Sequence, residues 1–187
     1  MSAAADPGWG EAIGKLPTTL LPTRGMRMAF ASADGLTVMR VLWLTFTAAM
    51  VLLGVVVVLI DSFAPGGGVD GRVVVAAVVG FGVLAQLVAT KAVDEVTGAT
   101  PAEVRTSAQR AFFLRVALAQ PAALLGFLGF VVSGNVAVYV AGLAVAMVGL
   151  WEAAPTRSWI ERGQRQLHDA GSEVDLLAAL VSGGITR

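Results

Sequence analysis

The sequence of 187 residues contains no cysteine and a single histidine, His168. Without cysteine there are no disulfide bonds, no thiolate metal ligands and no cysteine nucleophile, and the redox compartment is left open. One histidine cannot by itself build a metal-binding cluster. We therefore expect no metal site, no cofactor and no enzymatic activity.

Charge is scarce as well. Charged residues make up 14% of the chain and the net charge is zero, whereas soluble domains average about 25% charged residues. Apolar residues reach 56%, and the mean hydropathy is +0.77. The lack of a basic field argues against a nucleic-acid partner. This composition is that of a membrane protein, so the first expected partner is the lipid bilayer.

Long apolar runs predict an all-α, polytopic fold with four transmembrane helices arranged as two hairpins. A helix rises 1.5 Å per residue, so about 20 apolar residues cross ~30 Å of hydrocarbon. Clusters of Gly and Pro, such as FAPGGGVDG over 63–71, end one run before the next begins. The predicted spans are residues 36–60, 72–93, 111–132 and 136–154, within a transmembrane domain of 35–155.

Two helix starts have clear local signals. Asp34 is a good N-cap for the first span. Thr100, Pro101 and Glu103 combine an N-cap, a proline at the first helical position and a capping glutamate. This combination predicts a helix that starts in water at Pro101 and continues into the third span.

The two ends of the chain are predicted to stay outside the bilayer. Residues 1–34 lack the pattern of a signal peptide. We interpret them as a flexible cytoplasmic segment or, alternatively, as a segment whose apolar residues lie along the membrane or on a partner. These residues are Trp9, Leu20, Leu21, Met26, Met28 and Phe30. The amphipathic tail, 156–187, is predicted to hold two short helices that lie on the membrane surface. The expected start signals and interfacial residues of the tail are Ser158 with Glu161, Ser172 with Asp175, and Trp159 with Ile160.

The distribution of Lys and Arg predicts the orientation. These residues gather in the two ends of the chain and in the 91–110 loop, while the other two turns have Arg72 alone at an edge. Positive residues favour the cytoplasmic side, so both termini and the central loop are predicted to be cytoplasmic (N-in/C-in), in the inner membrane of a bacterial cell. Arg40 would extend to the lipid headgroups. The expected interfacial aromatics are Trp43, Trp151 and Trp159 on that side and Tyr139 on the other.

Four polar residues inside the predicted spans are candidate functional groups. Arg115 and Glu152 fall at similar depth on antiparallel helices, so we predict an ion pair, which would be a structural clasp or part of an ion or proton path. Arg115 could instead extend to the headgroups. Gln120 and Gln86 either satisfy backbone groups such as the carbonyl freed by Pro121, or build a ligand or ion site.

Small residues on the last two spans predict close helix packing. The first two spans are richer in Val and Leu and are expected to face lipid. The same small residues suit packing within the chain or between subunits. The packing candidates are Gly126, Gly129, Gly142 and Gly149.

The middle of the chain, residues 80–133, resembles the proteolipid (c) subunit of F-type ATP synthases. That family is a helical hairpin with a cytoplasmic loop and an ion-binding carboxylate on its second helix. The matching residues are Gly80 and Gly82, Lys91-Ala92-Val93, Pro101, Phe112-Phe113 and Ala117-Leu118. Gln120 stands at the carboxylate position, and Arg115 is foreign to the pattern. Because glutamine cannot exchange a proton, the resemblance does not imply proton translocation.

The chain as a whole looks like uncharacterised four-span membrane proteins of high-GC bacteria. The expected function is that of a non-catalytic membrane subunit or scaffold, which forms a homo-oligomer or joins a larger membrane complex. The alternative is a small transporter or ion-conducting component that uses the intramembrane polar residues. A membrane enzyme acting on lipid is a third reading, which no triad, metal cluster or phosphate motif supports.

Overall fold

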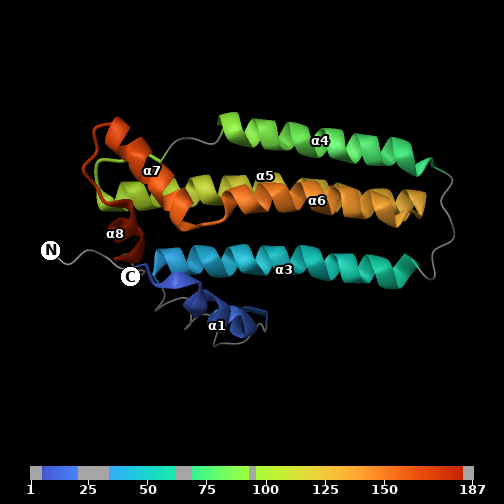
Figure 1. The fold of residues 1–187 in the computed structure, drawn as a ribbon, viewed down its shortest axis with the longest axis horizontal. Helices are drawn as coiled ribbons and strands as arrows, with labels where there is room; N and C mark the ends of the chain where they lie inside the picture. The colour runs from blue at the N-terminus through green and yellow to red at the C-terminus, as the bar shows by residue number, and fades with distance from the viewer. Residues whose placement is uncertain (1–5, 21–33, 62–68, 93–95, 183–187) are drawn as a thin grey trace. The chain divides into compact units, whose positions relative to one another are not determined.

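The computed structural model describes residues 6–20, 34–61, 69–92 and 96–182, and every regular element in these ranges is an α-helix (Figure 1). The protein is all-α, as predicted. In chain order the helices are α1 (Gly8–Leu20), α3 (Gly35–Asp61), α4 (Gly71–Ala92), α5 (Pro101–Ser133), α6 (Val136–Ala153), α7 (Arg157–Asp169) and α8 (Leu176–Val181).

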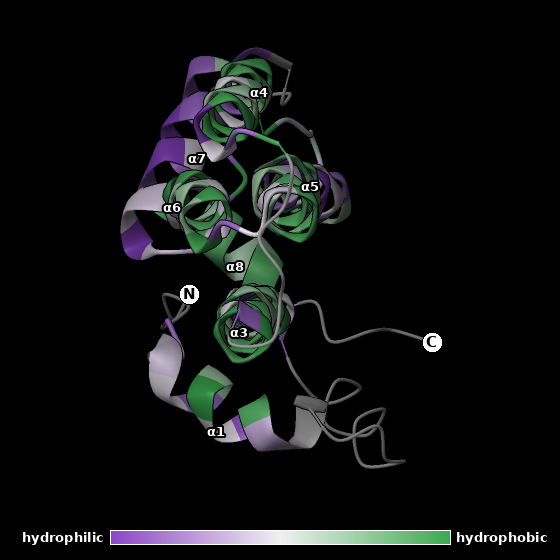
Figure 2. Cartoon of the chain, turned by 90° about the vertical axis from the view of Figure 1, so that its right-hand side faces the viewer, coloured by the Kyte–Doolittle hydropathy of each residue, from purple (hydrophilic) through white to green (hydrophobic). Residues whose placement is uncertain are grey.

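Four of these helices, α3, α4, α5 and α6, are long and apolar enough to cross a membrane. The protein is therefore a polytopic membrane protein. Each of these helices begins and ends within one residue of its predicted ends. For the third, the predicted start is Pro101, where the helix begins in water before the span. Figure 2 shows the same four helices coloured mostly hydrophobic, whereas α7 carries many hydrophilic residues.

The predicted start signals of α3 and α5 are confirmed. Asp34 accepts hydrogen bonds from the backbone N and the Oγ1 of Thr37, at 2.7 and 2.8 Å. Glu103 accepts from the backbone N of Thr100 at 3.3 Å and donates its own N–H to the Thr100 Oγ1 at 3.3 Å. This reciprocal pair is a capping box. After it, α5 runs without a break through Pro121 to its end.

The starts of the two tail helices differ from the prediction. Thr156 caps α7, and Asp175 alone caps α8. Ser158 is already inside α7, and the Oγ of Ser172 donates to the Gly98 carbonyl at 2.9 Å. A cap forms at the first acceptor side chain that meets the free amides of the first turn. Thr156 and Ser158 both carry a hydroxyl near the start of α7, and their spacing in the sequence does not show which of them is the cap.

Contacts divide the chain into two compact units, which are described separately. The terminal unit comprises residues 1–45, 94–113 and 154–187. The span unit comprises residues 46–93 and 114–153. Helices α3 and α5 each contribute their first turns to the terminal unit and their remaining turns to the span unit.

In the span unit, α5 and α6 lie between α4 on one side and α3 on the other (Figures 1 and 2). In the most apolar window of each helix, 11% of residues are buried in α3 and 22% in α4, against 44% in α5 and 39% in α6. Most side chains of α3 and α4 are therefore available to lipid. The core clusters that join α3 to its neighbours are Met50 with Ala122, Ala123 and Ala146, and Val57 with Phe130 and Tyr139.

The terminal unit has a hydrophobic core of its own, which includes the apolar face of α7. Trp159, Ile160, Gly163 and Leu167 are buried, and their spacing places them on one side of the helix. The prediction that Trp159 and Ile160 rest on the membrane is therefore wrong. An amphipathic period shows that one face is covered, but it does not show whether protein or lipid covers it.

The three segments of the terminal unit are joined by hydrogen bonds. The backbone N of Val96 donates to Gln166 at 3.4 Å, and the Arg40 guanidinium donates to the Pro155 carbonyl at 3.3 Å. Two spanning helices separate each segment from the next along the chain. An even number of crossings returns the chain to the side it started from, which agrees with the prediction that both termini and the central loop share one side.

Candidate functional site

The most developed polar site lies in the terminal unit around Arg40 of α3. The Arg40 side chain is only 1% exposed. Its guanidinium forms two bonds with the Asp6 carboxylate, at 2.5 and 2.9 Å, and donates to the carbonyl oxygens of Gly8 at 3.0 Å and Pro155 at 3.3 Å. A paired fork of this kind is the strong form of an ion pair. We call Arg40, Asp6, Gly8, Trp9 and Pro155 the Arg40 cluster.

Aromatic rings complete the Arg40 cluster. The guanidinium carbon lies 5.1 Å from the centroid of the Trp9 ring, a cation–π distance. Trp9 also meets Trp43 of α3 edge to face, with ring centroids 5.6 Å apart. These contacts attach the start of α1 to the first turns of α3.

The carboxyl group of Asp6 is held in its charged form. The hydrogen bonds from Arg40 lower the pKa of this carboxyl below its ordinary value, and burial opposes them. The backbone N–H of Gly8, the charge of Arg40 and the charge of Arg157 add to the lowering. Gly8 has a φ of +78°, a conformation that favours glycine. Both its N–H and its carbonyl oxygen contact the ion pair.

The Arg40 cluster corrects two predictions. Arg40 does not extend to lipid headgroups, because its charge is buried and satisfied by protein groups. The N-terminal segment was predicted to be flexible. Its described part instead forms the helix α1, and Asp6, two residues before this helix, attaches it to Arg40 of α3. The apolar residues Leu21, Met26, Met28 and Phe30 lie outside the described residues.

In the span unit, glycines bring α4, α5 and α6 into close contact. A methyl group added to Gly142 of α6 would overlap the Ala122 carbonyl and lie 3.0 Å from the Cα of Gly126. One added to Gly126 would lie 3.2 Å from the Cα of Gly142, and one added to Gly129 would lie 2.7 Å from Val74 of α4. At all four glycines singled out in the sequence, Gly149 included, an added methyl group would lie closer to a neighbour than ordinary van der Waals contact.

Gln86 of α4 fills the space that Gly149 of α6 leaves. A methyl group at Gly149 would collide with the Gln86 amide. Within the described part of the chain, the Gln86 Nε2 is buried and has no hydrogen-bond partner. A buried donor without a partner costs about 1–3 kcal/mol, so Gln86 is the candidate polar group whose position most needs a functional reason.

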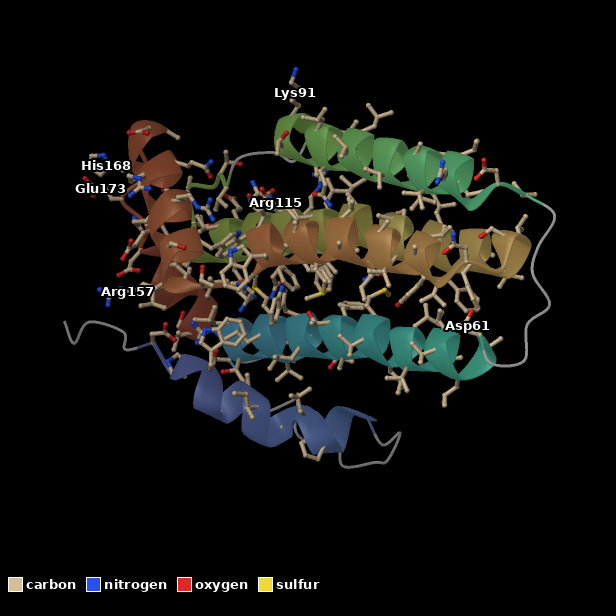
Figure 3. The ribbon with its side chains drawn as sticks, turned by 45° about the vertical axis from the view of Figure 1, so that its right-hand side comes forward. Asp61, Lys91, Arg115, Arg157, His168 and Glu173 are labelled. Carbon is tan, nitrogen blue, oxygen red and sulfur yellow. The ribbon has the colours of Figure 1, made fainter. Side chains whose placement is uncertain are left out.

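The other three intramembrane candidates lie in the span unit with Gln86. Arg115 of α5 is half-buried and interacts with a neighbour, and Figure 3 shows it toward the same end of the unit as Lys91 and away from Asp61. Glu152 is exposed near the end of α6, and Gln120 is half-buried. The Arg115–Glu152 ion pair stays a prediction.

An apolar groove runs along the outer surface of the span unit between α3 and α6. It measures about 400 Å³. Tyr139, predicted at the membrane interface, is instead buried beside Gly54 at this groove, and its hydroxyl donates to the Met50 carbonyl at 2.5 Å. The interfacial prediction for Tyr139 is therefore wrong, because the phenol found a backbone acceptor inside the bundle. The residues lining the groove are Val51, Gly54, Val55, Val58, Leu59, Val136, Tyr139, Val140 and Leu143.

Sequence reasoning missed both the Arg40 cluster and the groove. An arginine one turn inside a span was a signal that an anion was needed, but Asp6 is 34 residues away. Trp9 and Trp43 were noted only as candidates for the membrane surface. No local pattern marks a groove, because its walls come from two helices far apart in the sequence.

Neither a cluster of metal-ligand side chains nor a match to a known protein identifies this site. Within the described ranges, no three His, Cys, Asp or Glu side chains come together as metal ligands. Comparison of the chain with family models, with curated proteins and with solved structures gave no match.

Proposed function

We propose that this protein is a non-catalytic subunit or scaffold of a bacterial cytoplasmic membrane, which associates through its spanning helices with a second copy or with a larger membrane complex. The observation that carries the proposal is the groove between α3 and α6. It lies in the unit that crosses the membrane, and its lining is apolar.

A groove of this kind suits a partner helix. Helices associate in lipid by close van der Waals packing, which small residues and shape complementarity favour. Gly54 lowers the floor of the groove, and valines line its walls. The Tyr139 hydroxyl in the lining already donates its hydrogen bond to the Met50 carbonyl. The groove therefore offers a partner an apolar surface and a complementary shape, and the Tyr139 hydroxyl needs no hydrogen bond from that partner.

The terminal unit supports the same proposal. Three separate segments of chain build it, and side-chain hydrogen bonds fix them together. Lys and Arg are concentrated in these segments, so we place the terminal unit in the cytoplasm by the positive-inside rule. A folded unit on that side would offer a soluble partner a defined surface, as an accessory subunit requires.

Cysteine cross-linking in native membranes tests the proposal, because the chain has no cysteine of its own. Val55→Cys places a thiol in the groove, and Val73→Cys places one on exposed α4 as the matched control. We expect Val55→Cys to form a disulfide-linked dimer, or a cross-link to another membrane protein, and Val73→Cys to form neither. Equal cross-linking at both positions, or none at Val55, would count against the groove as the interface.

A second candidate function, a small transporter or ion-conducting component, rests on Gln86. Its buried Nε2 without a partner is the kind of group that a passing ligand could satisfy. Liposome flux of the wild type, compared with Gln86→Leu, Gln120→Ala and Arg115→Ala, tests this candidate. Absence of flux in the wild type would eliminate it. The resemblance to the ATP synthase c subunit stays a prediction in either case.

A further inference from the structure

The Arg40 cluster has a property that the proposed scaffold does not require. An arginine keeps its charge at every accessible pH, and Arg40 is almost fully buried. Asp6 supplies the anion for this charge and belongs to a different segment, at the entry to α1. The charge of Arg40 is therefore neutralised only while α1 stays attached.

We propose that Asp6 and Arg40 form a latch, in which the docked position of α1 depends on a single ion pair and loss of the Asp6 charge releases α1 from α3. The physical reason is the cost of a buried charge without its partner, which exceeds the cost of removing both charges together. When Asp6 is neutral, water must reach Arg40, and α1 with Trp9 must move to let it in.

Few of the described side chains of α1 are buried, so an Arg40 charge left without its anion can outweigh the contacts that hold the helix. Ala12 is its one fully buried apolar residue among those whose side chains are described, whereas Ile13 is 55% exposed. The ion pair between Glu11 and Lys15 lies within α1 and does not attach the helix to α3. The cation–π contact of Trp9 depends on the same guanidinium.

The latch also joins α1 to the tail. The Arg40 Nε donates to the carbonyl of Pro155, the residue just before the cap of α7. One guanidinium thus holds the start of α1 and the entry to α7 at once. Release of α1 removes the anion that keeps Arg40 in this position, so the two ends of the chain are coupled through one side chain.

Single-cysteine labelling of the protein in lipid nanodiscs tests the latch. Ala12→Cys reports the docked face of α1, and Ile13→Cys, on the exposed face, controls for access of N-ethylmaleimide. We expect Asp6→Asn to speed labelling at position 12 by about tenfold or more, as local opening requires. Labelling at position 13 should not change. Glu11→Gln, which breaks the ion pair within α1, should leave labelling at position 12 slow.

A double variant separates the stranded charge from the lost contacts. In Asp6→Asn with Arg40→Met, no charge is buried, and we expect labelling at position 12 to return toward the slow wild-type rate. If the double variant labels as fast as Asp6→Asn alone, the stranded charge is not the cause of release and the latch is overturned.

A second readout covers the case in which Ala12→Cys does not accumulate. Lys15 is half-buried on α1, so trypsin cleavage after Lys15 should be faster in Asp6→Asn than in the wild type or in Glu11→Gln. If Asp6→Asn leaves both position 12 and Lys15 as protected as in the wild type, α1 does not depend on the ion pair and the proposal fails.

Discussion

The hydroxyl of Tyr139 donates a 2.5 Å hydrogen bond to the backbone carbonyl of Met50, and this bond joins α6 to α3 inside the span unit. Loss of this hydrogen bond costs free energy, because neither atom has water as an alternative partner in the bilayer. We expect Tyr139→Phe to lower the free energy of unfolding by about 0.5–1.5 kcal/mol. Reversible unfolding in micelles measures this. A change near zero would mean that ring packing alone fixes Tyr139.

The contact between Gly142 and the Ala122 carbonyl should be sensitive to a single methyl group. We expect Gly142→Ala to lower the free energy of unfolding by about 1–3 kcal/mol, because the added atom forces α5 and α6 apart. Gly80→Ala is the matched control, since a methyl group there meets nothing within 4 Å. Equal effects of the two changes would show that α5 and α6 can separate at little cost.

Docking of α1 should weaken in acid. The pKa of Asp6 is lowered in the folded protein, so the docked state binds the proton less tightly than the released state. The contribution of Asp6 is therefore fully present above its ordinary pKa of about 4. It is lost as the pH falls through the lowered value.

Hydrogen exchange of the α1 amides, corrected for the intrinsic pH dependence, measures this loss of docking. Protection in the wild type should stay constant above the ordinary pKa of about 4 and fall as the pH is lowered below it. Asp6→Asn should show weak protection throughout this pH range. Protection that stays constant in the wild type below this pKa as well would contradict the role of the Asp6 charge.

Gln164 should hold α8 in place. Its Nε2 donates to the Val174 carbonyl at 3.1 Å, and its Oε1 accepts from the Leu176 N–H at 2.7 Å. Gln164→Leu leaves both backbone groups without this partner, at a cost of about 1–3 kcal/mol. We expect faster hydrogen exchange over α8 in this variant. The control is Arg165→Leu on the exposed face of α7, and similar exchange in both variants would refute the role of Gln164.

Local features could be predicted from the sequence, and contacts between distant segments could not. Thr100 and Glu103 of the capping box are only three positions apart, so the motif can be recognised in the sequence. The ends of the spans follow from apolar length and from Gly and Pro. The Asp6–Arg40 pair joins positions 34 apart, and the Tyr139–Met50 bond joins positions 89 apart. The residues between the partners contain no pattern that identifies either contact.

The interfacial aromatics show the same limit. Trp and Tyr are suited both to the membrane interface and to a buried site that offers a hydrogen-bond partner. Trp151 is 79% exposed, as an interfacial residue would be. Trp159 and Tyr139 were predicted at the interface as well, but they are buried. Only the packing of other helices decides between the two outcomes.

We propose that the spanning helices associate with a partner through the α3–α6 groove. The most direct test is native mass spectrometry of protein extracted from its own membrane in nanodiscs, without detergent. We expect a mass of two or more chains of 19.2 kDa, or of one chain with another subunit. Val55→Trp, which fills the groove, should shift the mass to the single chain. A single chain of 19.2 kDa in the wild type at every expression level would contradict the claim.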